Sequence, residues 1–197
     1  DGDDRLRIKC PSVWVVDPLD GTKEFTRQIP EFAISVGLLH HHEVVMGGVV
    51  NPMTGEGGVG CANGFHFWGI KTKPCRANDL DQATASVSRS EMEDGSVLPY
   101  LSLVGTTRTV GSIAYKLLRV AAGTEDLTFS VWPKSEWDIC GGVGLLLAVG
   151  KNYLRLDGEA LFFNQPEPRI SCGAVAGPPL LATSFLERWK KISPDAS

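Results

Sequence analysis

The chain has 197 residues, of which 43% are hydrophobic and 21% are charged, so it holds enough apolar material for a globular core. Its net charge of −4 argues against a nucleic-acid-binding protein, because such proteins normally present a basic surface. No apolar run approaches the ~20 residues that a transmembrane helix requires. Five widely spaced cysteines without a Cys-x-x-Cys pair favour free thiols, and we therefore expect a cytoplasmic protein.

Short apolar runs separated by turn residues predict a β-rich region in the first part of the chain. We expect a buried strand at residues 14–16 that ends at Asp17, because Pro18 cannot continue a strand. A short helix should follow at residues 22–28. Two β-hairpins come next, with strands at residues 32–39, 44–50, 59–61 and 66–68.

A polar stretch at residues 71–81 separates this region from the rest, so we expect two domains, residues 1–77 and 78–197. The second domain should contain two apolar helices and a C-terminal amphipathic helix, at residues 113–122, 137–149 and 180–192. Strands are expected at residues 85–88, 127–131, 153–156, 161–163 and 171–176. An Asp-Gly turn at residues 157–158 would join the third and fourth of these strands as a hairpin.

The segment Asp17-Pro18-Leu19-Asp20-Gly21-Thr22 brings two carboxylates together after an apolar strand. A Pro-containing turn is the plainer interpretation, because Asp and Gly are common in turns. However, burying an unpaired carboxylate at the end of a strand is energetically unfavourable, and two carboxylates repel each other unless a cation lies between them. Mg²⁺ prefers carboxylate and carbonyl oxygens, and the Leu19 carbonyl stands between the two side chains. Gly21 and Thr22, at a helix start, then suit a phosphate.

Asp138 is a third candidate metal ligand, at the start of the second apolar helix. An Asp in this place is commonly a helix cap, and taken alone we favour that interpretation. If the helix points toward residues 17–20, Asp138 becomes a third carboxylate for the same ions. The sequence spacing leaves both interpretations open.

Two motifs, in this order, resemble signatures of the inositol monophosphatase superfamily. They are Asp17-Pro18-Leu19-Asp20-Gly21-Thr22 and Trp137-Asp138-Ile139-Cys140-Gly141-Gly142. The resemblance covers nearly the whole chain and implies an α+β fold, the layered αβαβα sandwich of the sugar phosphatases, here without its N-terminal helices. Within the superfamily, three segments are most similar to the 3'(2'),5'-bisphosphate nucleotidase branch, namely Lys23-Glu24-Phe25, Ser88-Arg89-Ser90 and residues 133–138.

The resemblance also implies roles for individual residues around two or three Mg²⁺ ions. Asp17 would bridge two ions, the Leu19 carbonyl would bind one of them, and Asp20 and Asp138 would bind the other. Backbone N–H groups of Gly21 and Thr22 would hold the phosphate, and the Thr22 hydroxyl would orient the attacking water. Three further residues would contact the substrate, namely Gly111, Ser112 and Lys116. Lys116 would meet a second anionic group, although a solvated helix lysine is an equal alternative.

The implied activity is hydrolysis of a small phosphate ester, with adenosine 3',5'-bisphosphate losing its 3'-phosphate to a metal-activated water. Inositol monophosphatase activity is the alternative within the superfamily. A domain that binds metal and phosphate with weak or no catalysis is the alternative from a different class. We expect a small phosphorylated substrate, no nucleic-acid polymer and no membrane partner, while the resemblance further implies a homodimer and sensitivity to lithium.

One metal ligand of the superfamily has no counterpart here. Its members carry a Glu-Glu motif shortly before the first signature, and that Glu binds metal and activates water. Only 16 residues precede Asp17, and none of them is Glu. The chain therefore resembles an N-terminally truncated member, in which the segment is lost, supplied as a separate piece, or absent from a non-catalytic product. Glu91 also stands where nucleotidases often carry His, which weakens the nucleotide assignment.

Histidine and tryptophan residues offer two further candidate sites. The run His40-His41-His42 lies in the first predicted hairpin turn, where adjacent side chains splay apart. We interpret these histidines as solvated turn residues rather than a metal site. Trp14, Trp68 and Trp132 are interpreted as core residues rather than a stacking platform.

Overall fold

The first sheet is an antiparallel meander in which each strand pairs with the next along the chain. The computed structural model describes residues 4–74 and 77–193, and a short helix, α1 (Asp4–Lys9), precedes this sheet. The strands are β1 (Ser12–Asp20), β2 (Ala33–His40), β3 (Glu43–Val50), β4 (Gly57–Cys61) and β5 (Gly64–Trp68). Both predicted hairpins are confirmed, and the predicted helix after the first strand is α2 (Thr22–Thr26).

The second sheet mixes parallel and antiparallel pairs in the order β10-β12-β8-β6-β7. Its strands are β6 (Thr84–Ser88), β7 (Thr106–Val110), β8 (Leu127–Ser130), β10 (Asn152–Arg155) and β12 (Ala174–Gly177). Strand β6 runs parallel to β7 and β8, whereas β12 runs antiparallel to β8 and β10. Two very short strands, β9 (Lys134–Ser135) and β11 (Arg169–Ile170), form a separate ladder.

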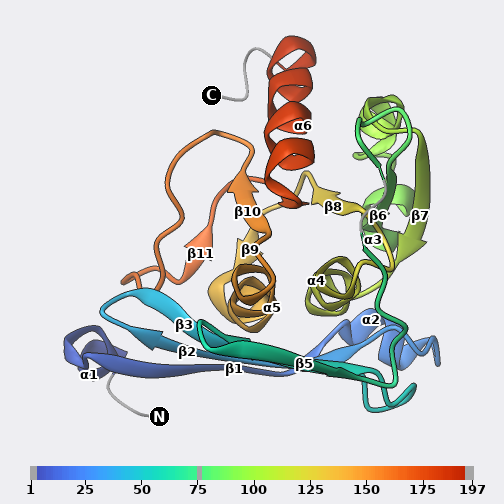
Figure 1. Ribbon diagram of the computed structural model, residues 1–197. Coiled ribbons are helices and arrows are strands. Elements are labelled where there is room, and N and C mark those ends of the chain that lie inside the picture. The colour runs from blue at the N-terminus through green and yellow to red at the C-terminus, as the bar shows by residue number, and fades with distance from the viewer. Residues whose placement is uncertain (1–3, 75–76, 194–197) are drawn as a thin grey trace.

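Helices α4 (Ile113–Ala122) and α5 (Glu136–Ala148) lie between the two sheets, and α6 (Pro179–Ile192) packs on β10 and β12 (Figure 1). Helix α3 (Arg89–Glu93) and the 3-10 helix η1 (Leu98–Leu103) connect β6 to β7. The layered sandwich that the resemblance implied is confirmed, as a sheet, a helix pair, a second sheet and an outer helix. In residues 4–74 and 77–193, no helix has the length and apolar character needed to cross a bilayer.

Strand β1 continues past Asp17 to Asp20, so the prediction that Pro18 ends it was wrong. The pairing with β2 shifts between Asp17 and Asp20, which marks a bulge at the proline. Strand β1 is an edge strand, and there a proline at a bulge removes no required ladder hydrogen bond. The bulge places both carboxylates near the end of one strand.

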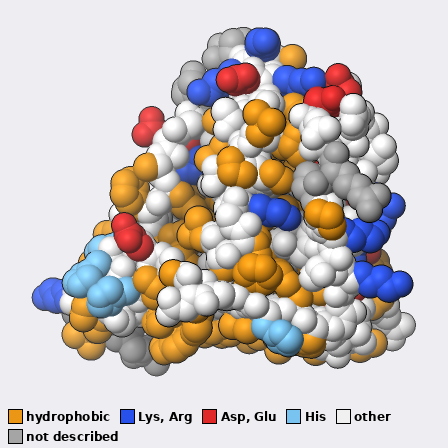
Figure 2. Space-filling model, in the orientation of Figure 1, with side chains coloured by type: hydrophobic (Ala, Val, Ile, Leu, Met, Phe, Trp, Pro, Cys, Tyr) orange, Lys and Arg blue, Asp and Glu red, His pale blue; other side chains and the backbone are white. Residues whose placement is uncertain are grey.

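The three tryptophans interpreted as core residues are exposed, so that interpretation was wrong. Trp14, Trp68 and Trp132 are 58%, 40% and 39% exposed. Alternation along β1 turns Val13 and Val15 toward the core and leaves Trp14 on the outer face of the first sheet. Figure 2 shows hydrophobic side chains along the lower edge of the molecule, over this sheet. The first sheet is therefore apolar on both faces, and its strand at residues 14–16 is not buried.

Two segments of the second half differ from the prediction. The sequence Thr-Thr-Arg-Thr-Val of β7 was not predicted as a strand, because its polar residues alternate on an edge of the second sheet. Residues 161–163, predicted as a strand, form a loop instead. Strand β10 pairs with β12, and the Glu136 carboxylate holds the loop by accepting the N–H groups of Asn164 and Gln165 at 2.7 and 2.9 Å.

His41 and His42 form the exposed β2–β3 turn, as predicted, whereas His40 is the exposed last residue of β2. His41 and His42 adopt left-handed backbone conformations, with φ of 49° and 69°. His42 Nδ1 lies 3.2 Å from the carbonyl oxygen of Phe163. None of these histidines belongs to the acidic cluster that the described residues contain.

Helix α5 packs on the first sheet through glycine contacts that leave no room for a side chain. A Cβ atom at Gly47 would lie 2.1 Å from the Gly141 carbonyl oxygen and 2.8 Å from Gly144 Cα, whereas at Gly48 the nearest atom is 3.6 Å away. We expect Gly47→Ala to lower the free energy of unfolding by about 3 kcal/mol. The matched change Gly48→Ala should alter it by less than about 1 kcal/mol. Urea denaturation of both variants measures this difference, and equal effects would contradict the close packing.

Candidate active site

Three carboxylates from distant parts of the chain converge at one end of the sandwich. Asp17 and Asp20 come from β1, and Asp138 comes from the first turn of α5. One carboxylate oxygen from each lies within 4.8 Å of the others. Helix α5, which begins at Glu136, therefore points toward residues 17–20. This is the direction that Asp138 needs in order to lie beside the other two carboxylates.

Hydrogen bonds fix each carboxylate of this cluster. Asp17 Oδ1 accepts the Leu19 N–H at 2.9 Å. Asp20 Oδ2 reaches the start of α4, where it accepts the Ser112 hydroxyl at 2.5 Å and the Ala114 N–H at 2.7 Å. Asp138 Oδ2 accepts the Ser135 N–H at 2.8 Å, as part of a capping box. Asp138 therefore caps α5 and also belongs to the acidic cluster, so the two interpretations do not exclude each other.

Ser112 holds a strained backbone conformation at this point. Its φ of 53° is unusual for a residue other than glycine. Its hydroxyl donates to Asp20 and accepts the Tyr115 N–H at 3.0 Å, so the strain accompanies two contacts at the first turn of α4. Such strain costs on the order of 1–3 kcal/mol and is concentrated at functional sites.

The electrostatics of the cluster favour a cation. Burial raises the pKa of Asp20 to about 6, and the nearby Asp138 and Asp17 carboxylates add to this rise, against the lowering effect of its two hydrogen bonds. Burial also raises the pKa of Asp138, as does the charge of Asp17. A divalent cation would relieve this repulsion, and an all-oxygen donor set is the one that Mg²⁺ prefers. The residues present therefore fit magnesium.

A cavity of about 240 Å³ opens beside the cluster. It is lined by Asp20 and Asp138 together with all of the residues predicted to contact phosphate or substrate, namely Gly21, Thr22, Gly111, Ser112 and Lys116. The Thr22 hydroxyl donates to the Leu19 carbonyl at 3.3 Å, which brings the remaining predicted ligand to the same place. Asp17 does not line the cavity itself, but it belongs to the acidic cluster with Asp20 and Asp138, which do.

Gly21 shapes the rim of this cavity. Its φ of +90° lies in the left-handed region, and a Cβ atom would come within 3.0 Å of the Glu31 carbonyl oxygen and of Ser112 Cβ. Only glycine adopts this conformation here without strain. The close approach lets the start of α2 lie directly against the start of α4.

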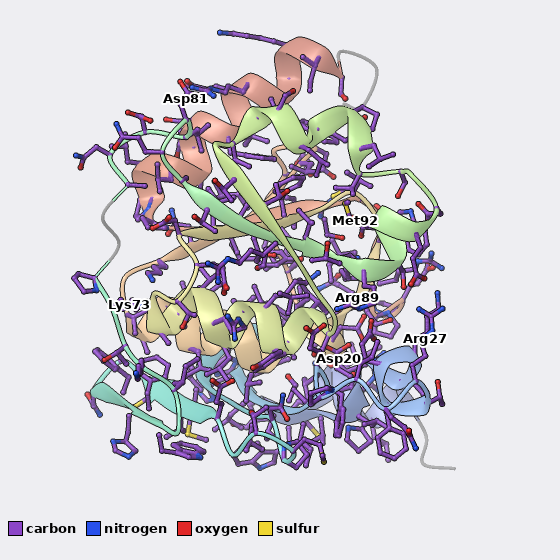
Figure 3. The ribbon with its side chains drawn as sticks, turned by 90° about the vertical axis from the view of Figure 1, so that its right-hand side faces the viewer. Asp20, Arg27, Lys73, Asp81, Arg89 and Met92 are labelled. Carbon is purple, nitrogen blue, oxygen red and sulfur yellow. The ribbon has the colours of Figure 1, made fainter. Side chains whose placement is uncertain are left out.

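The sequence analysis missed several residues that line the cavity, and an ion-pair network next to it. Arg89 lies 2.7 Å from Glu31 and 3.8 Å from Glu24, and Glu31 Oε2 also accepts the Gly111 N–H at 2.8 Å. The Gly111 amide is therefore engaged by a carboxylate. Figure 3 shows Arg89 and Asp20 on the same side of the molecule. The missed residues that line the cavity are Lys23, Glu24, Ser88, Ser90, Ile113 and Lys134.

A comparison with protein-family models decides the family. The model described as the inositol monophosphatase family matches residues 4–190 of the chain. The chain belongs to the inositol monophosphatase family. Its acidic cluster of Asp17, Asp20 and Asp138 is the candidate metal site of this family member.

Some curated relatives of this inositol monophosphatase family member are named for an inositol phosphate and others for a phosphorylated nucleotide. The chain is 30% identical over 184 residues to inositol-1-monophosphatase of Bacillus subtilis, covering 90% of this chain and 67% of that protein. It is 29% identical over 201 residues to 3'-phosphoadenosine 5'-phosphate phosphatase of Mycobacterium leprae, covering 95% and 72%. It is 30% identical over 166 residues to 3'(2'),5'-bisphosphate nucleotidase CysQ of Escherichia coli, covering 81% and 65%. The chain is therefore shorter than these relatives.

Solved structures agree on the fold. Inositol monophosphatase-II of Staphylococcus aureus superposes with a TM-score of 0.79 at 24% identity, over 94% of this chain and 69% of that chain. Inositol monophosphatase of Anabaena superposes with a TM-score of 0.77 at 24% identity, over 92% and 74%. The layered sandwich of this inositol monophosphatase family member is therefore the fold of those structures.

Proposed function

We propose that this protein is a Mg²⁺-dependent phosphomonoesterase that removes the 3'-phosphate of adenosine 3',5'-bisphosphate. The observation that carries the proposal is that acidic side chains and a buried lysine line the same cavity. Asp20 and Asp138 suit metal ions, while Lys116 places a buried cation in the same cavity. A substrate with two phosphates matches both features. The free thiols of the described cysteines are in keeping with a cytoplasmic location.

We assign the roles as the resemblance implied them. The Asp17, Asp20 and Asp138 carboxylates and the Leu19 carbonyl would hold the magnesium. Bound magnesium would make a coordinated water more acidic and would stabilise the attacking and leaving oxygens. The N–H groups of Gly21 and Thr22, at the start of α2, would hold the phosphoryl oxygens.

Other residues of the chain orient the reactants. The Thr22 hydroxyl, now donating to the Leu19 carbonyl, would turn to orient the attacking water. The Ser112 hydroxyl keeps the Asp20 carboxylate facing the cavity. Lys116 would attract the second phosphate, because its ammonium group is buried beside the cavity.

Inositol monophosphatase activity is the second candidate, favoured by the Bacillus subtilis relative at 30% identity. A third candidate is a weak or inactive domain that binds metal and phosphate and depends on a Glu supplied by another segment.

Phosphate release from adenosine 3',5'-bisphosphate and from inositol 1-phosphate, with and without Mg²⁺, tests the proposal. We expect kcat/KM to be at least about tenfold higher for the bisphosphate, because a charged contact to the second phosphate is worth about 1.5–3 kcal/mol. Faster release from inositol 1-phosphate would select the second candidate. No release from either substrate by the folded chain would select the third.

A further inference from the structure

The wall of the cavity beside the acidic cluster is basic. Lys116 and Lys134 both line it. Lys116 is 2% exposed, and its ammonium group has no hydrogen bond or ion pair with any residue in the described part of the chain. Lys134 is the better anchored of the two, because its Nζ donates to the carbonyl oxygens of Trp132 and Pro133 at 3.0 and 3.3 Å.

Glu91 also forms an ion pair with Lys134. Its Oε1 lies 3.5 Å from Lys134 Nζ, and the residue is completely buried. The Ser130 hydroxyl and the Val131 N–H, the latter at 3.0 Å, donate to the two oxygens of this carboxylate. Glu91 therefore cannot move away without leaving buried donors unpaired, and it fixes the place of the Lys134 ammonium.

The charges on this wall do not balance. Glu91 is the one described carboxylate within ion-pair distance of the two lysines, and it pairs with Lys134, so Lys116 has no ion-pair partner of its own among the described residues. The other acids that act on Lys116, Asp20 and Glu24, belong to the metal cluster and to the pairing with Arg89. A buried cation without a partner is costly, so an anionic group of a ligand would stabilise this wall.

We propose that Lys134 is a specificity-determining residue that contacts a second anionic group of the substrate, and that Glu91 is its positioning residue. The inference rests on the proposed phosphatase function and adds two residues to it. Lys134 approaches from β9 while Lys116 approaches from α4, so together they clamp an anion from two elements. A substrate with two phosphates is thereby favoured over one with a single phosphate.

The test compares two substrates that share the same scissile phosphate. Adenosine 3',5'-bisphosphate carries the second phosphate, and adenosine 3'-monophosphate lacks it. For Lys134→Met we expect KM for the bisphosphate to rise at least about tenfold. KM for the monophosphate should change less than about twofold, and kcat should be retained for both. Lys134→Arg should restore most of the affinity, and Lys190→Met, on the exposed face of α6, serves as the control for a lost surface charge.

The positioning role of Glu91 predicts that the effect of a Glu91 mutation requires Lys134. Glu91→Gln should raise KM for the bisphosphate at least about threefold, because the lysine loses its fixed partner. In the Lys134→Met background the same change should leave the ratio of the two KM values unaltered. Equal losses for both substrates, or no loss for either, would overturn the proposal.

A binding measurement tests the Lys134 contact even if the proposed phosphatase activity is absent. If the wild-type chain hydrolyses neither substrate, titration calorimetry with adenosine 3',5'-bisphosphate still compares wild type with Lys134→Met. Weaker binding by the variant would support the lysine contact without the phosphatase activity. Equal binding by both proteins would reject the contact itself.

Discussion

Replacing Asp17 with Asn should lower Mg²⁺-dependent phosphate release from adenosine 3',5'-bisphosphate at least about a hundredfold. Mutating a residue that only hydrogen-bonds to a metal ligand already lowers metal affinity or activity by about 10–100-fold, and Asp17 is proposed as a ligand itself. Asp17 is buried, and its oxygen lies within 4.8 Å of ligand oxygens of Asp20 and Asp138. Asparagine would remove one of the three negative charges proposed to hold magnesium. The measurement is initial-rate phosphate release across a Mg²⁺ titration.

A second readout keeps this prediction independent of turnover. Mg²⁺ should raise the melting temperature of the wild-type chain, because a ligand that binds only the folded state stabilises it. The rise should be absent in Asp17→Asn. Asp81→Asn is the matched control, since this exposed carboxylate pairs with Arg188 on α6 and should leave the Mg²⁺ response unchanged. An unchanged response in Asp17→Asn would show that the cluster binds no metal through this residue.

Replacing Lys116 with Met should stabilise the metal-free chain by about 1–3 kcal/mol at pH 7 while weakening the binding of the bisphosphate. Burial lowers the pKa of Lys116 to about 8, and the charge of Lys134 adds to the effect. The charged form is therefore disfavoured in the folded state. Methionine keeps the length of the side chain and removes the charge.

The pH dependence of this stabilisation has a definite sign. The pKa of Lys116 in the folded state lies below its ordinary value of 10.5, so the unfolded chain binds this proton more strongly. The destabilisation is fully present below pH 8 and disappears as the pH rises toward 10.5. Urea denaturation of wild type and Lys116→Met at pH 7 and pH 10 should show the difference shrinking. A destabilised Lys116→Met at pH 7 would contradict the prediction, and Lys190→Met controls for the loss of an exposed lysine.

Local signals made much of the fold predictable. Helix α4 occupies Ile113–Ala122, the range predicted, because Ser112 caps its start and Gly123 takes the left-handed conformation at its end. The two hairpins of the first sheet likewise follow from alternating apolar residues around turns. The exposure of Trp14 was not predictable in this way, because it depends on which face of the sheet the helices cover. The loop at residues 161–163 depends on the competing pairing of β10 with β12.

The candidate site was predictable only where one motif held several of its residues. Asp17, Leu19, Asp20, Gly21 and Thr22 are neighbours in sequence, so their chemistry could be read together. The approach of Asp138 depended on the direction of α5, which the spacing did not give. Lys134 and Glu91 are 43 residues apart, counted from their numbers, and neither carries a local signal for the other. Their pairing becomes visible only in the structure, where α3 meets β9.

The start of α4 serves both sides of the cavity. Ser112 and Ala114 hold the Asp20 carboxylate, and Lys116 follows one turn later on the same rigid helix. We expect binding on the acidic side to order the helix end that also presents the ammonium group. Thermodynamic linkage is reciprocal, so magnesium should then raise the affinity for the anion as much as the anion raises the affinity for magnesium. The helix would thus couple the two binding events in addition to any direct contact between magnesium and the substrate.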